Sequence, residues 1–299
     1  NEHGVAVRDI WSTSCQALID MTPKDQTGPN YSDLARIVME RATTAREGVE
    51  LIGSLMAAHG YSTYGGNSHF IADPDEAWVV IEYAGGKGLW CAERIGADDI
   101  RASRPGYIGE VPVDDPDHGD FLYAPNFRSV AIEEGWWSPD KGVSFNANLI
   151  YGDGKMRWDG VAWIEEEMRR RAARPEKISI TDMMWAIRTE KLTGDTAGYG
   201  QVVKLHHPEH TELRHIWHTQ IGAIAAPVVP VFMGCTEVPE EFRQHRYLTT
   251  GEDARFLNDR HATDDDASSV STVPQGIEST RSATVIFKRL LYLILQRHE

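Results

Sequence analysis

The sequence predicts an α+β protein whose sheets are mainly antiparallel, and three observations lead to this class. Strand-like segments follow one another with only turn residues between them, which favours hairpins over parallel crossover units. Amphipathic helical patterns come in pairs beside these strands. No glycine-rich phosphate loop opens a helix, because Gly85-Gly86-Lys87-Gly88 lies between two strands. A doubly wound nucleotide-binding fold is therefore disfavoured.

The first residues combine a turn with a strand. Asn1 and Gly4 are turn formers, and the β-branched run Val5-Ala6-Val7 follows them directly. We predict a strand within residues 1–13. Residues 14–31 contain two prolines and a glycine, and we predict a loop there.

A pair of helices is predicted next. Apolar residues at helical spacing between Leu34 and Arg41 define the first. Thr44 to Glu47 reads as a capping box at the start of the second, in which the Thr44 hydroxyl accepts from the Glu47 amide and Glu47 reaches back to the Thr44 amide. Gly60 is the expected C-terminal stop.

Three strands are predicted after the helix pair, at 68–72, 77–83 and 89–95. The turn residues Asp73-Pro74-Asp75-Glu76 join the first two as a hairpin. The segment Trp78-Val79-Val80-Ile81 is apolar at every position, so we expect both faces of that strand to be covered.

The remaining chain predicts helices with long connections. The expected helices span 127–135, 161–173, 181–192 and 287–296, and residues 138–158 are expected to form a loop. Residues 258–280 are rich in Asp and Ser and predict a long or disordered loop. No internal repeat divides the sequence, and we predict one domain over residues 1–299.

Composition excludes several classes of function. The 299 residues carry a net charge of −15, which repels nucleic acid. The longest apolar run, 221–234, contains two prolines and is too short to span a bilayer. The three cysteines are far apart and odd in number, which indicates neither a disulfide framework nor a zinc site. We expect a protein of the cytoplasm without membrane contact.

Histidine and cysteine are the residue types most often found as metal ligands or nucleophiles. Five histidines between His206 and His218 lack the regular spacing of a zinc site, so we expect a solvated polar segment and no metal or cofactor. Cys15, Cys91 and Cys235 have no adjacent base or basic neighbourhood, so we expect none of them to be a nucleophile. The pair Trp136-Trp137 packs in the core or lines a substrate pocket.

Several ordered segments resemble one family, the dipeptidase A and secernin group of N-terminal-nucleophile (Ntn) cysteine hydrolases. The segments that carry the resemblance are 1–6, 31–36, 40–47, 66–69, 72–78, 90–94 with Asp98-Asp99, 108–110, 234–239, and Ser282-Ala283 with Phe287. They keep their order over most of the chain. The resemblance implies a four-layer αββα sandwich with two stacked, mainly antiparallel sheets.

The resemblance also implies a mechanism. An N-terminal cysteine thiolate attacks an amide carbonyl, its own α-amino group serves as the base, and water clears the acyl-enzyme. In this family the cysteine lies upstream of the Asn-Glu-x-Gly turn, so we expect the nucleophile to precede Asn1 and residues 1–299 alone to be inactive. By resemblance, Asp9 to Trp11, Ser103 and Arg214 are the oxyanion-side or supporting residues, and they are expected to converge beside the first strand. The pair Trp136-Trp137 is the substrate-binding candidate.

Three functions remain open at this point. The leading one is a cysteine-dependent amide hydrolase, most simply a dipeptidase, whose partner is a small peptide or amide. The second is an acylase or acyltransferase that acts on a non-peptide amide, and the third is a non-catalytic relative that binds a ligand or partner. The coding sequence before Asn1 distinguishes them. For association we expect either a homo-oligomer or an added N-terminal segment.

One contrast between arginines is also predicted. Arg214 begins an apolar strand segment, where a buried guanidinium needs a carboxylate or a substrate. Arg169, Arg170 and Arg171 lie on a charged helix and are expected to be solvated.

Overall fold

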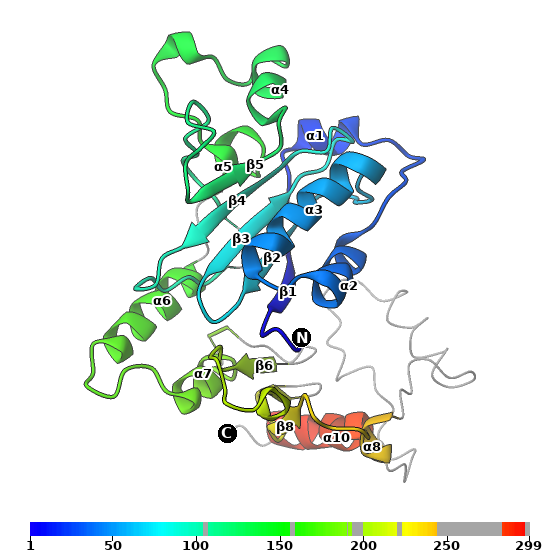
Figure 1. Cartoon of the computed structure of the whole chain (residues 1–299), viewed down its shortest axis with the longest axis vertical. Coiled ribbons are helices and arrows are strands. Elements are labelled where there is room, and N and C mark those ends of the chain that lie inside the picture. The colour runs from blue at the N-terminus through cyan, green and yellow to red at the C-terminus, as the bar shows by residue number, and fades with distance from the viewer. Residues whose placement is uncertain are drawn as a thin grey trace. The chain divides into compact units, whose positions relative to one another are not determined.

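The computed structural model describes residues 1–103, 107–155, 159–189, 191–192, 200–219, 223–243 and 283–296 (Figure 1). The chain forms two compact units. Unit 1 comprises residues 1–169 and 205–209, and unit 2 comprises residues 170–204 and 210–299. The predicted loop at 258–280 lies outside the described residues.

Unit 1 is built on a five-stranded antiparallel sheet with the order β1-β2-β3-β4-β5. Its strands are β1 (Ala6–Trp11), β2 (Asn67–Ala72), β3 (Ala77–Glu82), β4 (Trp90–Ile95) and β5 (Phe121–Tyr123). The predicted class, α+β with antiparallel sheets, is confirmed, and the three predicted strands agree with β2 to β4 to within one or two residues. The four residues of Trp78-Val79-Val80-Ile81 are all buried, as expected.

Helices α2 (Tyr31–Arg41) and α3 (Ala45–His59) cover one face of this sheet (Figure 1). The packing is close because α3 carries glycines where it meets the strands. A Cβ at Gly48 would lie 2.9 Å from Val38 and 3.2 Å from Ile71, and a Cβ at Gly53 would overlap the ring of Trp90. The helix pair therefore sits directly on the side chains of β2 and β4.

The ends of α3 follow the predicted signals with one difference. Thr44 is the N-cap and accepts from the Glu47 amide, and Gly60 ends the helix with φ +81°. The Glu47 carboxylate, however, accepts chiefly from the amide and hydroxyl of Thr43, the residue before the predicted partner. These bonds lower the pKa of Glu47.

Short helices complete unit 1. They are α1 (Gln16–Met21), α4 (Phe127–Glu133), the 3-10 turn Pro139–Lys141, and α5 (Ala147–Ile150). The longer helix α6 (Asp159–Ala172) follows and continues past Arg169, the last residue of this part of unit 1. The prediction of an uninterrupted loop over 14–31 was wrong, because α1 forms there with Leu18 fully buried. Residues 138–158 likewise contain two short helical turns.

Unit 2 contains a three-stranded antiparallel sheet of β6 (Gly200–Val203), β7 (His215–Thr219) and β8 (Val229–Phe232). Among the described residues of unit 2, the helical elements are α7 (Ile180–Ala186), the 3-10 turn Thr211–Leu213, α8 (Glu240–Arg243) and α10 (Ala283–Gln296). The helix predicted over 181–192 ends at Ala186. Within the described residues, no helix is both long and apolar enough to cross a membrane.

Candidate active site

The turn before β1 is held by the side chain of Asn1. Its Oδ1 accepts from the amides of His3 (3.1 Å) and Val5 (3.0 Å), which closes the turn around Gly4. Its Nδ2 donates to the carbonyl oxygens of Met39 (3.1 Å) and Ala42 (2.8 Å) at the end of α2. One asparagine thus fixes both the shape of the turn and its attachment to the helix layer.

Strand β1 presents the candidate residues Asp9 and Trp11 on one face. In the antiparallel register, Asp9 stands opposite His69 and Trp11 opposite Asn67. Directly opposed residues point to the same side of a sheet. Among the described strands, β1 pairs only with β2 and is the terminal strand of the sheet. The upstream nucleophile segment predicted beside it stays a prediction.

A buried polar pair lies beside β1, on the adjacent strands β2 and β3. The Nδ1 atom of His69 is 2.7 Å from Oε1 of Glu82, and Nε2 of His69 is 3.0 Å from the carbonyl oxygen of Tyr31. Both side chains are fully buried. The pair links β2 and β3 to the first residue of α2.

The protonation of this pair follows from its surroundings. Burial alone would lower the pKa of His69, but the Glu82 charge, its hydrogen bond and the Tyr31 carbonyl outweigh burial, so the pKa is raised. Burial raises the pKa of Glu82, although His69 opposes that shift. The negative charge of Asp9 raises the pKa of both groups, which places Asp9 within electrostatic reach.

Trp11 forms an aromatic surface at the end of β1. Its ring lies 5.0 Å from that of Tyr64, with an angle of 30° between their planes. The two residues are 42% and 68% exposed. The Trp11 Nε1 donates to Thr13 Oγ1 at 2.7 Å, which fixes the orientation of the indole. Two large exposed rings therefore lie together at the end of β1.

Ser103 lies at a second place in unit 1, beyond β4. A cavity of about 410 Å³ adjoins its loop, and charged side chains from β4, the following loop and α6 line it. Arg101 donates to Glu93 at 2.6 Å, and the amide of Ala102 donates to the buried Glu165 at 2.8 Å. Neither Asp9 nor Trp11 lines this cavity.

The other candidates have different settings. Arg214 belongs to unit 2, where it is half-buried between a 3-10 turn and β7, so its approach to β1 stays a prediction. Trp137 packs edge-on against Phe145 at 5.2 Å and donates to the Val143 carbonyl, and Trp136 packs against Tyr151 at 6.0 Å. Core packing accounts for these contacts, and substrate binding by the two tryptophans stays a prediction.

The segment that forms this site is similar to known peptidases. A family model for peptidase family C69 matches residues 1–159, which contain the Asn1 turn, β1 and the buried pair. The chain belongs to peptidase family C69. A probable dipeptidase B of Lactococcus lactis subsp. lactis (strain IL1403) is 33% identical over 149 residues. That alignment covers 48% of this chain and 30% of the relative, so the chain spans well under half of the curated relative that it matches.

The C69 match covers five of the six candidate residues, all except Arg214, together with two of the three cysteines. Cys91 is buried in β4, and burial raises the pKa of its thiol to about 12, which suppresses the thiolate. Cys15 is half-buried, and Cys235, outside the match, is exposed. Within the described residues, no group of three or more His, Cys, Asp or Glu side chains is arranged to hold a metal ion.

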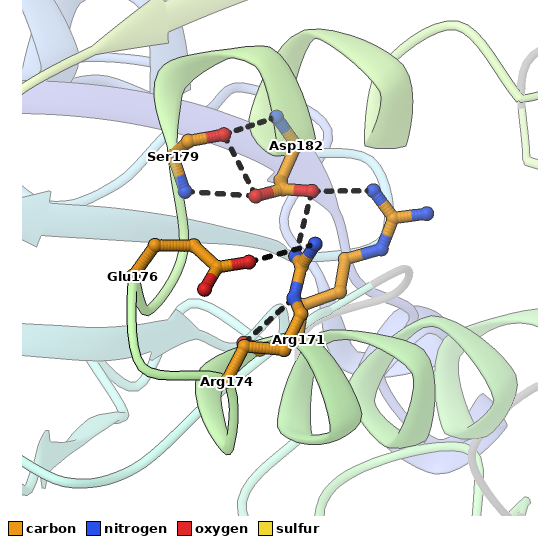
Figure 2. A network of polar contacts seen from close by, with 5 residues as sticks. All are labelled: Arg171, Arg174, Glu176, Ser179 and Asp182. Atoms are coloured by element: carbon orange, nitrogen blue, oxygen red, sulfur yellow. Dashed lines mark hydrogen bonds and ion pairs between the residues drawn. The ribbon is translucent and has the colours of Figure 1, made fainter.

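Two polar networks of this C69 member escaped sequence reasoning. The first is the pair His69–Glu82, whose members are 13 positions apart. The second is in unit 2, where Asp182 binds Arg171 (2.7 Å), Arg174 (2.9 Å) and Ser179 (Figure 2). The prediction that Arg171 is solvated was wrong, since its side chain is only 20% exposed and stacks on Trp185 at 3.8 Å. Arg169 is 54% exposed, as expected.

Proposed function

We propose that the full-length protein hydrolyses small peptides, most simply dipeptides, through a cysteine that precedes Asn1. The observation that carries this proposal is the match to peptidase family C69, which contains the Asn1 turn and β1. The name of the Lactococcus relative, a probable dipeptidase, supports the choice of substrate. The proposal includes the four-layer αββα sandwich that the Ntn resemblance implies.

In this mechanism the cysteine thiolate adds to the scissile carbonyl carbon, and the α-amino group of the same residue takes the thiol proton. Such an amine titrates near pH about 8, so it works as a base close to neutrality. The proton then passes to the leaving amine, and a thioester remains. Water attacks the thioester, which releases the acid and restores the thiol.

The edge of β1 that faces away from β2 is the surface that we assign to this chemistry. A strand at that edge would bring the cysteine alongside Asp9 and Trp11, where nearby hydrogen-bond donors would stabilise the oxyanion. Ser103 and Arg214 are assigned as supporting residues by resemblance. The exposed rings of Trp11 and Tyr64 offer an apolar side chain of the substrate a flat surface.

The test is a labelling experiment on the full-length protein. Iodoacetamide should abolish dipeptide hydrolysis, and mass spectrometry should find the label that correlates with the loss on a cysteine before residue 1. A variant in which Cys15, Cys91 and Cys235 are all serine should keep its activity. A folded protein that cleaves no dipeptide overturns the proposed function, and a loss of more than about a hundredfold in the triple variant overturns the proposed nucleophile.

A further inference from the structure

Polar residues on β2 and β3 are in register with Asp9 and Trp11, the two candidate residues on β1. On β2, His69 stands opposite Asp9, and Asn67 stands opposite Trp11. Asn67 also stands opposite Glu82 on β3, so all five side chains point to the same face of the sheet. Each candidate residue on β1 thus has a buried polar neighbour of its own.

Asn67 and Glu82 are incompletely bonded. Asn67 is 3% exposed and Glu82 fully buried, yet Asn67 Nδ2 and Glu82 Oε2 have no hydrogen-bond partner among the described residues. Directly opposed residues have their Cβ atoms about 4.5–5.5 Å apart, so this donor and this acceptor are close enough to share one bridging molecule, although they do not bond to each other. Such buried groups are costly unless something engages them.

The protons of the pair can be counted from the contacts. The Tyr31 carbonyl oxygen can only accept, so His69 Nε2 must carry a hydrogen. A second hydrogen must lie between Nδ1 and Oε1, because two lone pairs would otherwise face each other at 2.7 Å. The pair is therefore neutral overall, whether it is written as imidazolium and carboxylate or as imidazole and carboxylic acid.

We propose that His69, Glu82 and Asn67 are positioning residues for the reaction at β1, holding Asp9 and Trp11 in place and keeping the neighbouring His69–Glu82 pair electrically neutral. This inference rests on the proposed function. Reactive groups need neighbouring residues that hold them rigidly in place. A buried ion pair is seldom needed for stability, because apolar residues of similar size stabilise a fold equally well. His69, Glu82 and Asn67 meet this need, because they are buried and in register with Asp9 and Trp11.

The groups that face the pair come from every element around it. They are Asp9 on β1, the Tyr31 carbonyl at the start of α2, and Tyr61 just after α3. Burial, and then the Glu82 charge, raises the pKa of Tyr61 well above its ordinary value, so its hydroxyl stays neutral. Asp9 is consequently the carboxylate on the neighbouring strand that a change in the protonation of the pair would influence most directly.

The experiment compares variants in full-length protein. Glu82→Gln keeps the shape of the side chain but cannot hold the shared proton, and Asn67→Ser removes the amide with less risk to folding. The control is Ser68→Ala, since Ser68 is equally buried on β2 and binds the Ile10 carbonyl (3.0 Å), but on the opposite face of the sheet. For each we would measure kcat and KM against pH for one dipeptide, and the side-chain nitrogen shifts of His69 by NMR.

We expect kcat to fall about ten- to a hundredfold in Glu82→Gln and Asn67→Ser with a smaller change in KM, and the pH profile of Glu82→Gln to shift. Ser68→Ala should keep the wild-type pH profile. In the wild type, His69 should keep Nε2 protonated throughout the neutral range. If the wild type is active and both variants match Ser68→Ala, or if His69 Nε2 titrates near neutrality, the positioning inference is overturned. An inactive wild type overturns the proposed function instead.

Discussion

Asp73 joins the β2–β3 turn to the start of α3 by accepting a 2.6 Å hydrogen bond from the backbone amide of Ala45. Its other carboxylate oxygen accepts from the amides of Asp75 (2.8 Å) and Glu76 (2.9 Å). A single buried carboxylate therefore shapes a hairpin turn and binds a helix N-terminus, where a negative charge is favourable.

We predict that Asp73→Ala lowers the free energy of unfolding by about 2 kcal/mol or more, because three backbone amides lose their acceptor. Urea denaturation measures this. Asp75→Asn is the matched control, since the Asp75 side chain is 80% exposed and its contact with His207 at 3.3 Å is a surface ion pair. Equal stability of the two variants would show that the Asp73 bonds contribute nothing.

The Asp182 network predicts a dependence of stability on pH. Hydrogen bonds from Arg174 first, and then from Ser179 and Arg171, lower the pKa of Asp182 below its ordinary value of 3.8. Because the folded pKa lies below the unfolded one, the network stabilises the protein above pH about 4, and this contribution is lost as the pH falls further.

Thermal unfolding between about pH 3 and 7 tests this. Asp182→Asn should lower the unfolding temperature at pH 7. In this variant the unfolding temperature should also decrease less than in the wild type as the pH is lowered to about 3. Glu176→Gln is the control, because Glu176 is 62% exposed and lies 3.8 Å from Arg174. A variant that loses the same stability at both ends of the range would contradict the assigned role.

The cysteines should differ in reactivity with alkylating agents. Cys91 is buried and the pKa of its thiol is raised to about 12, whereas Cys235 is exposed. At pH about 8 we expect iodoacetamide to modify Cys235 in the native protein and Cys91 only after unfolding, because the thiolate is the reactive form. Mass spectrometry with and without denaturant gives the answer, and rapid native labelling of Cys91 would show that β4 opens.

The ring pair Trp11–Tyr64 should affect substrate preference. We predict that Trp11→Ala reduces kcat/KM for a phenylalanine-containing dipeptide about three- to tenfold more than for an alanine-containing one, which is the range of an aromatic contact. Leu149→Ala is the control, as Leu149 is an exposed apolar residue (67%) on α5. An unchanged preference would remove the ring pair from the substrate site.

Local signals predicted most of the strands and helices of unit 1. The turn at Asp73 and the cap at Thr44 are formed by residues within four positions of each other, so their bonds can be inferred from sequence. The shift of the Glu47 contact to Thr43 could not, because the two residues offer similar donors. Helix α1 was missed since a helix this short depends on the burial of Leu18 rather than on propensity.

The polar networks required three-dimensional information. His69 and Glu82 meet only once the β2–β3 register is set, although two ionisable residues inside apolar strands were a signal that could have been used. Arg171 lies in a run of three arginines, and sequence offers no means of telling which one turns towards Asp182. The meeting of Asp9, Ser103 and Arg214 stays a prediction.

The position of β1 has a consequence for the order of folding. Strands β2, β3 and β4 are joined by short turns, whereas β1 meets β2 only after the whole segment from Ser12 to Gly66 has closed on itself. Closing so long a segment costs conformational entropy before the β1–β2 contacts can form. We therefore expect β1 to pair with β2 late in folding and to separate from it first on unfolding. Its amide hydrogens should exchange with solvent through local openings that leave β3 protected. A further segment that paired with β1 would therefore strengthen the attachment of Asp9 and Trp11 to the sheet.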